Sequence, residues 1–134
     1  MTVLVDTSVW SLALRRDTPP ELPEVQELRR ELARGEVVTT GLVLQEILQG
    51  LAGPRNRGEI IGHFDALPML APDRHDHVEA AQLRNACRAK GVQIGTIDAL
   101  LAQLCIQHAV TMLTTDRDFV RIAELFPLKV WAAA

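Results

Sequence analysis

Two kinds of hydrophobic pattern alternate along the chain: short apolar runs and longer stripes with helical spacing. The short runs predict buried strands at residues 2–5, 37–39, 67–71, 110–114 and 128–131. The stripes predict helices at residues 9–14, 21–34, 42–51, 55–66, 73–90, 96–108 and 116–125. Strands that alternate with helices favour an α/β domain, with a mainly parallel sheet and helices on both of its faces.

The boundaries between these elements carry residues suited to turns and caps. Residues 17–20 (Asp-Thr-Pro-Pro) predict a loop, and Gly53 with Pro54 predicts a break. Gly35 and Gly91 are suited to end helices, and the hydroxyl of Thr96 is suited to cap one.

The helix at residues 21–34 is clearly amphipathic. Its apolar face carries Val25, Leu28 and Leu32. Glu27 is spaced to pair with Arg30, and Glu31 with Arg34, on the side that we expect to be exposed.

Composition indicates a single domain spanning residues 1–134. The chain is 48% hydrophobic, enough for a core without disulfides or a structural metal, and Cys87 and Cys105 lie in apolar helical stripes as expected for buried thiols. The sequence has no recognisable leader and no bilayer-spanning apolar run, so we expect a cytoplasmic protein without a membrane partner. The net charge of -3 argues mildly against nucleic-acid binding, unless several of the acids bind divalent cations.

Acidic residues follow two of the predicted strands directly. Asp6 follows the first strand and Asp116 the fourth, and the carboxyl ends of parallel strands meet at one edge of a sheet. Each acid taken alone is equally consistent with a turn or a helix cap. Two such acids, each followed by a helix, favour a shared site.

Two further acids lie on helices. Asp98 begins an apolar stripe in the first turn of its helix, where burial opposes its charge, although a helix-dipole acid explains it as well. Glu46 lies on a strongly apolar helix and is also explained as a solvated surface residue. Clustered carboxylates repel one another unless protons or cations intervene, and Mg²⁺ or Mn²⁺ prefers oxygen ligands. Such a site suits phosphodiester hydrolysis by activated water.

Four segments resemble the motifs of PIN-domain nucleases. They are residues 6–10 (Asp-Thr-Ser-Val-Trp), Glu46 on its helix, residues 95–102 (Gly-Thr-Ile-Asp-Ala-Leu-Leu-Ala) and residues 114–119 (Thr-Thr-Asp-Arg-Asp-Phe). In length and motif order the whole chain is similar to VapC-type toxins of bacterial toxin–antitoxin pairs. The segment at residues 53–77 matches no motif, so we expect substrate choice to lie there.

The resemblance implies a metal-dependent endoribonuclease that uses Mg²⁺ or Mn²⁺. It implies that the metal-binding and catalytic residues are Asp6, Glu46, Asp98 and Asp116. Supporting roles fall to Thr7, Ser8, Thr115 and Asp118, and Arg117 is the best candidate to contact RNA phosphate. The implied partners are an RNA substrate, an antitoxin protein and a second copy of the chain. We expect the antitoxin to lie on an exposed apolar patch of the helix at residues 9–14, with parts of those at 21–34 and 42–51.

Other residues have simpler explanations. His75, Asp76 and His77 have poor spacing for a metal site and fit a helix start, while Trp10 fits the core or a subunit interface better than base stacking. Candidate phosphate-binding arginines are Arg15, Arg16, Arg55, Arg57, Arg117 and Arg121.

Three competing functions are weaker. A receiver-like domain needs an acid at the end of the third strand, where Ala71 and Pro72 stand. A haloacid-dehalogenase-like phosphatase needs a second acid where Ser8 stands. A catalytically silent PIN-like domain that only binds RNA or protein remains open, although none of the four acids is missing.

Overall fold

The computed structural model describes residues 1–15, 21–50 and 54–133, with the side chains of residues 54 and 55 left out. The strands are β1 Val3–Val5, β2 Val37–Thr40, β3 Met69–Leu70 and β4 Thr111–Leu113. The helices are α1 Thr7–Ala13, α2 Pro23–Arg34, α3 Gly41–Gly50, α4 Pro54–Asp65, α5 Arg74–Ala89, α6 Thr96–His108 and α7 Arg117–Leu125. The expected loop at residues 17–20, the residues Arg16, Leu51 and Gly53, and the side chain of Arg55 lie outside the described part of the chain.

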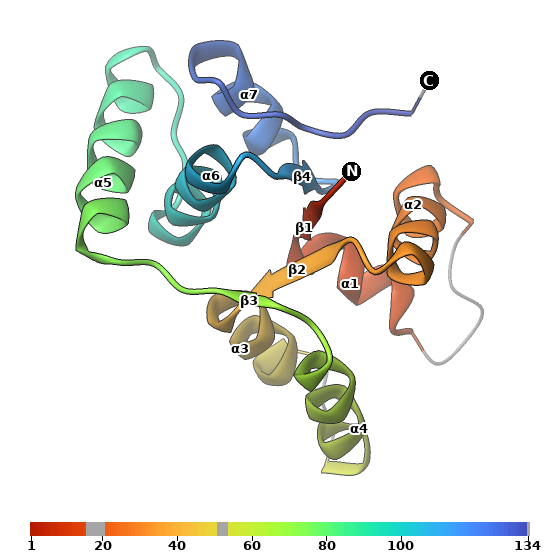
Figure 1. Ribbon diagram of the computed structural model, residues 1–134. Helices are drawn as coiled ribbons and strands as arrows, with labels where there is room; N and C mark the ends of the chain where they lie inside the picture. The colour runs from red at the N-terminus through yellow and green to blue at the C-terminus, as the bar shows by residue number, and fades with distance from the viewer. Residues whose placement is uncertain (16–20, 51–53, 134) are drawn as a thin grey trace.

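The sheet is parallel throughout, in the order β3-β2-β1-β4. This confirms the predicted α/β class, and Figure 1 shows α5, α6 and α7 gathered on one side of the sheet and α1 and α2 on the other. Within the described residues, no helix combines the length and the apolar composition that a membrane span requires.

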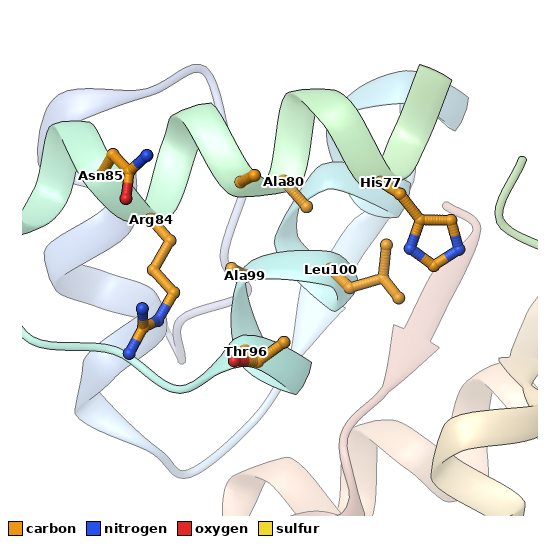
Figure 2. Close-up of a pocket in the computed structure, with 8 residues that line it drawn as sticks. His77, Ala80, Arg84, Asn85, Thr96, Ala99 and Leu100 are labelled. Carbon is orange, nitrogen blue, oxygen red and sulfur yellow. The ribbon is translucent and has the colours of Figure 1, made fainter. Parts of the chain in front are cut away.

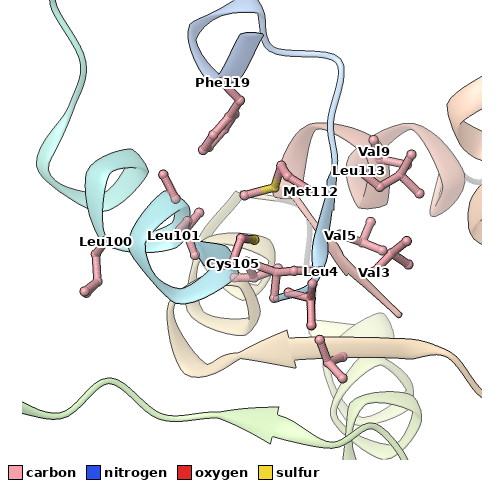
Figure 3. Close-up of a cluster of buried hydrophobic side chains, with 14 of the residues drawn as sticks. Val3, Leu4, Val5, Val9, Leu100, Leu101, Cys105, Met112, Leu113 and Phe119 are labelled. Atoms are coloured by element: carbon pink, nitrogen blue, oxygen red, sulfur yellow. The ribbon is translucent and has the colours of Figure 1, made fainter. Parts of the chain in front are cut away.

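The core forms on both faces of β1, whose three residues are all fully buried. Figure 3 shows Leu4 directed toward Cys105 on α6, whereas Val3 and Val5 are directed to the other side, as the alternation of side chains in a strand requires. Each face of the central strand is therefore covered by helices, and the polar residue that follows it is held at the edge of a rigid core.

Two predicted strands are shorter than expected. β3 has only two residues, because Pro68 offers a carbonyl to the backbone N–H of Thr39 but has no N–H to extend the ladder. The strand expected at residues 128–131 is wrong: a single parallel bridge joins Val130 to Met112, where the N–H of Met112 donates to Lys129 and its carbonyl accepts from Trp131.

The start of α6 also differs from expectation. Gly95 occupies the capping position with extended backbone angles, and Thr96 is the first helical residue, so its hydroxyl does not cap the helix. Gly35 ends α2 and has φ +72°, and Gly91 after α5 has φ +79°, which confirms both as stop residues.

The buried face of α2 is rotated relative to the predicted one. Leu32 is 40% exposed, whereas Glu31 is fully buried and Glu27 nearly so. Both acids do pair with their arginines, with Arg30 Nη2 at 2.6 Å from Glu27 and Arg34 Nη1 at 3.2 Å from Glu31. The expected exposure of these pairs was wrong, because only the arginine ends reach solvent while they compensate the buried charges.

An apolar groove of about 270 Å³ lies between α1, α2 and α4. The residues lining it include Trp10, Leu14, Leu28, Leu32, Ile60 and Phe64. The patch expected on α1 is mostly not exposed: Val9 and Trp10 are buried, and Trp10 packs on Phe64 with ring centroids 4.8 Å apart. The third wall of this groove is supplied by α4 and not by α3.

Candidate active site

Asp6 ends the central strand and is held there by backbone and side-chain bonds. Its N–H donates to the carbonyl of Leu113 at 2.9 Å, which continues the pairing of β1 with β4. The side chain is buried, and its Oδ2 accepts bonds from the hydroxyls of Ser8 at 2.8 Å and Thr114 at 2.9 Å. The carboxylate is thus positioned by the end of β1, by the first turn of α1 and by the residue that follows β4.

The two hydroxyls are themselves oriented by the chain that follows β4. Asp116 N–H donates to Thr114 Oγ1 at 2.9 Å, and Thr115 N–H donates to Ser8 Oγ at 3.1 Å. Each hydroxyl oxygen accepts a backbone proton and uses its own proton to bond Asp6. Both bonds go to Oδ2, and no described residue hydrogen-bonds Oδ1.

Glu46 reaches the site from α3. The hydroxyl of Thr40 caps the first turn of this helix by accepting the N–H of Val43 at 3.2 Å, so the helix begins directly at the end of β2. Glu46 is half-buried in the second turn, and its Oε1 accepts the hydroxyl of Thr7 at 3.1 Å. A glutamate that only faced solvent would not make this contact, so the explanation of Glu46 as a solvated surface residue does not fit.

Asp116 and Asp118 open α7. Asp116 caps the helix by accepting the N–H of Asp118 at 2.9 Å through Oδ1. Asp98, Asp116 and Asp118 each offer a carboxylate oxygen, and these three oxygens lie within 4.8 Å of one another. Asp118 also lies 3.5 Å from the guanidinium of Arg121, so part of its charge is balanced from the same helix.

Asp98 experiences the charges of the whole cluster. Burial, followed by the negative charges of Asp6, Asp116, Asp118 and Glu46, raises the pKa of Asp98 from 3.8 to about 6. A helix-dipole acid at the first turn would favour the charged form instead. The four carboxylate charges that add to the effect of burial mark Asp98 as a member of a crowded carboxylate site.

The neighbouring thiol offers no competing chemistry. Cys105 is buried beneath the site, and burial together with the charge of Asp6 raises its pKa well above the usual range. A thiol that stays protonated is a poor nucleophile and a poor metal ligand.

The donor set fits a hard divalent cation. Among the residues that the structure describes, the charged groups that converge are carboxylates, without imidazole or thiolate ligands, and hard cations prefer such oxygen donors. A cation between Asp98, Asp116 and Asp118 would offset both the burial of the Asp98 charge and the repulsion from its neighbours, which together raise its pKa.

A model of the PIN domain matches residues 3–125 of the sequence. The chain belongs to the PIN-domain family. Ribonuclease VapC11 of Mycobacterium tuberculosis is 30% identical over 129 residues, which cover 95% of this chain and 96% of that protein. A VapC ribonuclease of Mycobacterium bovis has the same identity and coverage.

Several solved structures share the fold of this PIN domain. DNA-bound VapBC of Salmonella typhimurium superposes with a TM-score of 0.78 at 22% identity, covering 98% of this chain and 97% of that one. FitAB bound to a DNA fragment gives 0.77 at 23% identity, with 97% and 94% covered. VapC20 of Mycobacterium tuberculosis, a toxin that cleaves the sarcin–ricin loop, gives 0.66 at 16% identity, with 89% and 93% covered.

The fold of this PIN domain brings the four acids singled out in the sequence to one place. The charges of Asp6, Glu46 and Asp116 all act on Asp98. Arg117 is exposed beside Asp116, as its position in the sequence requires.

Sequence reasoning missed Thr114. It favoured the hydroxyl of Thr115, yet the side chain of Thr115 is exposed and the residue contributes its backbone N–H, whereas the buried hydroxyl of Thr114 bonds Asp6. The position of Thr114 directly after β4 could have indicated that its hydroxyl lies at the edge of the sheet.

The segment with His75 and His77 is a helix start, as predicted, since Asp76 and Asp73 form a reciprocal capping box there.

Proposed function

We propose that the chain is a Mg²⁺- or Mn²⁺-dependent endoribonuclease and the toxin of a type II toxin–antitoxin pair. The observation that carries the proposal is the acidic cluster at Asp98: carboxylate oxygens of Asp98, Asp116 and Asp118 lie within 4.8 Å of one another, and the charges of Asp6 and Glu46 also act on Asp98. The relatives named VapC ribonucleases support the choice of RNA as the substrate class.

The chain's own groups divide into ligands and positioning groups. Asp98, Asp116 and Asp118 would hold the cation, and Oδ1 of Asp6 faces no competing donor among the described residues. Ser8 and Thr114 fix the orientation of Asp6, and Thr7 fixes Glu46. When bound, the cation supplies a lowered pKa for water and stabilisation of charge on the phosphate.

The reaction class follows from the acidic donor set. Water attacks phosphorus, a new phosphorus–oxygen bond forms, and the bond from phosphorus to the 3′ oxygen breaks, which leaves a 3′-hydroxyl and a 5′-phosphate. Glu46 lies at the edge of the cluster, held by Thr7, where a carboxylate is suited to accept a proton from the attacking water.

Purified chain tests this proposal on single-stranded and stem-loop RNA, with Mg²⁺, Mn²⁺ or excess EDTA. We expect cleavage only with metal and 5′-phosphate products, read by sequencing the new 5′ ends. Replacing Asp6, Asp98 or Asp116 by Asn should lower the rate at least about a hundredfold, by analogy with damaged metal sites. Full activity in EDTA, or cyclic-phosphate products, would rule the mechanism out.

The second candidate is a silent domain that only binds RNA or a partner protein. This candidate would have the same PIN fold but would not hydrolyse RNA. Retention of all four acids, with the charges of the other three acting on Asp98, favours the enzyme. A chain that binds RNA tightly and leaves it intact in both metals would support the binding protein instead.

The apolar groove between α1, α2 and α4 is the surface proposed for the antitoxin. Leu14 and Leu32 are 37% and 40% exposed along it, and Arg29 and His63 lie at its polar edge. An amphipathic helix places apolar anchors in such a groove, and an acidic residue beside them would meet Arg29. An antitoxin arginine that reached the carboxylates would compete with the metal.

We also propose that the chain acts in a bacterial cytoplasm as a homodimer. Sedimentation of the purified chain tests the homodimer.

A further inference from the structure

A second pocket, of about 220 Å³, lies between α5 and α6 and is lined by none of the five clustered carboxylates. Its apolar floor is formed by Ala80, Ala99 and Leu100, all of which are buried. Figure 2 shows Arg84 and Asn85 coming from α5 and Thr96 from the start of α6. The helix that forms one wall is therefore the helix that carries Asp98 in its first turn.

Arg84 is the positioned charge of this pocket. Its Nε donates to the carbonyl of Ile94 at 2.9 Å, which fixes the guanidinium against the segment that leads into α6 (Figure 2). The bond uses one of five N–H donors, so the terminal nitrogens keep their capacity for a further acceptor.

The charge of Arg84 is not compensated by an acid. Arg30, Arg34 and Arg121 each lie within salt-bridge distance of a carboxylate, whereas Arg84 has no such partner among the residues that the structure describes. A half-buried, pre-oriented guanidinium loses little conformational entropy when it binds an anion, and its planar fork matches phosphate geometry.

We propose that this pocket is a nucleotide subsite, in which Arg84 binds an RNA phosphate neighbouring the scissile one and the apolar floor contacts the attached ribose or base. This inference rests on the proposed ribonuclease function. The five carboxylates repel an approaching RNA strand, and a cationic group that contacts the strand offsets part of this repulsion. Thr96 and Asp98 both lie in the first turn of α6 and point to different faces of it, so the pocket and the carboxylate cluster flank the same helix end.

The chemistry of the rim favours a nucleotide over an apolar partner. Asn85 offers an amide and His77 an imidazole to the polar edges of a base or ribose, beside a floor of small apolar side chains. The volume is small for a drug-sized ligand and suits one ribose–phosphate or one base. A base on an apolar platform with its phosphate on a cation is the usual arrangement for single-stranded RNA.

The test measures binding, so that it does not depend on catalysis. A fluorescently labelled single-stranded RNA of mixed sequence is titrated with the full chain carrying Asp98→Asn, in Mg²⁺, over a series of salt concentrations. Adding Arg84→Gln should weaken binding about tenfold and reduce the slope of log K against log salt by about 0.7, the value for one phosphate contact on a single strand. Arg84→Lys, which keeps the charge, should retain the slope.

Two further variants separate the pocket from general charge effects. Arg74→Gln removes the same charge from the first turn of the same helix but does not line the pocket, and its slope should stay at the parent value. Ala81→Leu fills the pocket from an exposed position and should weaken binding while leaving the melting temperature unchanged.

The proposal is overturned if Arg84→Gln and Arg74→Gln have the same slope. It is also overturned if Ala81→Leu dissociates a dimer and leaves RNA affinity intact, because the pocket would then be a contact between two copies of the chain. Failure of the proposed function has a different signature, which is absence of metal-dependent cleavage by the unmodified chain, whatever the binding slopes are.

Discussion

The hydroxyl oxygen of Thr114 lies 2.9 Å from Oδ2 of Asp6 and connects the carboxyl ends of the neighbouring parallel strands β4 and β1. The same oxygen accepts the N–H of Asp116 at 2.9 Å. One buried side chain therefore sets the orientation of one acid and the position of the backbone that carries another. Thr114 acts through these two acids, so we treat it as a positioning residue.

Replacing Thr114 by Val keeps the shape of the side chain and removes its hydroxyl. We expect a loss of about 1–3 kcal/mol in the free energy of unfolding, because the N–H of Asp116 loses its acceptor in a partly buried site. Affinity for Mn²⁺ should fall about 10- to 100-fold, as for lost outer ligand contacts. Urea unfolding and calorimetric titration measure the two effects. Thr114→Ser restores the hydroxyl and should recover Mn²⁺ affinity; a Val variant with native affinity contradicts the role.

Metal binding should raise the melting temperature of the chain. The native cluster offers several carboxylates to one cation, whereas the unfolded chain does not hold them together. A cation at a hundredfold excess over its dissociation constant would stabilise the native state by about 2.7 kcal/mol. Differential scanning fluorimetry with and without Mn²⁺ measures the shift. Asp98→Asn should abolish most of it, while Asp65→Asn, at an exposed residue of α4, should leave it intact. An equal shift in both variants would place the metal elsewhere.

The raised pKa of Asp98 makes the stability of the metal-free protein depend on pH. In the native state the pKa is about 6, above the value of about 3.9 for an unfolded chain. Between these values the native state binds more protons than the unfolded state, so the contribution of Asp98 to stability grows as pH falls through about 6 and declines as pH rises. Above that pH the charged carboxylate destabilises the native cluster.

Urea unfolding in EDTA at several pH values between 4 and 7.5 tests this, with Asp98→Asn as the comparison. At pH 7.5 the variant should be at least as stable as the parent, because it removes a repelled charge. Its advantage should shrink as the pH falls through about 6. A variant that is strongly destabilised at every pH would instead mark Asp98 as a structural helix-start residue.

The groove between α1, α2 and α4 predicts a separation of function. Leu32→Glu places a charge on its exposed rim and should abolish capture of the co-expressed protein encoded next to this one, without changing RNA cleavage. Val78→Glu is the matched control, since Val78 is 50% exposed on α5 and lies outside the groove. A pull-down assay measures capture of the partner protein, and a growth assay measures the toxicity expected from RNA cleavage. Equal loss of capture in both variants would indicate that the partner binds elsewhere or that charge alone disrupts it.

The sequence by itself determined the α/β class and most element boundaries, and it predicted the four acids. These features are local: apolar spacing reports helices and strands, and an acid directly after a buried strand must lie at the sheet edge. Asp6 and Asp116 were therefore predictable from their position after β1 and β4. Asp98 and Glu46 were candidates from their places on apolar helices, which leave their orientation undetermined, and the motif resemblance supported both.

Only the tertiary structure decided which neighbours these residues meet. The bond from Thr114 to Asp6 joins residues 108 positions apart, and the pocket around Arg84 depends on how α5 lies against α6. The helical spacing of α2 predicted that Glu31 is exposed, but Glu31 is buried. Spacing identifies the apolar face of a helix, but it does not show how much of the rest of the helix neighbouring elements cover. A one-dimensional pattern constrains the periodicity of an element, whereas burial and hydrogen-bond partners depend on the rotation and offset that long-range packing imposes.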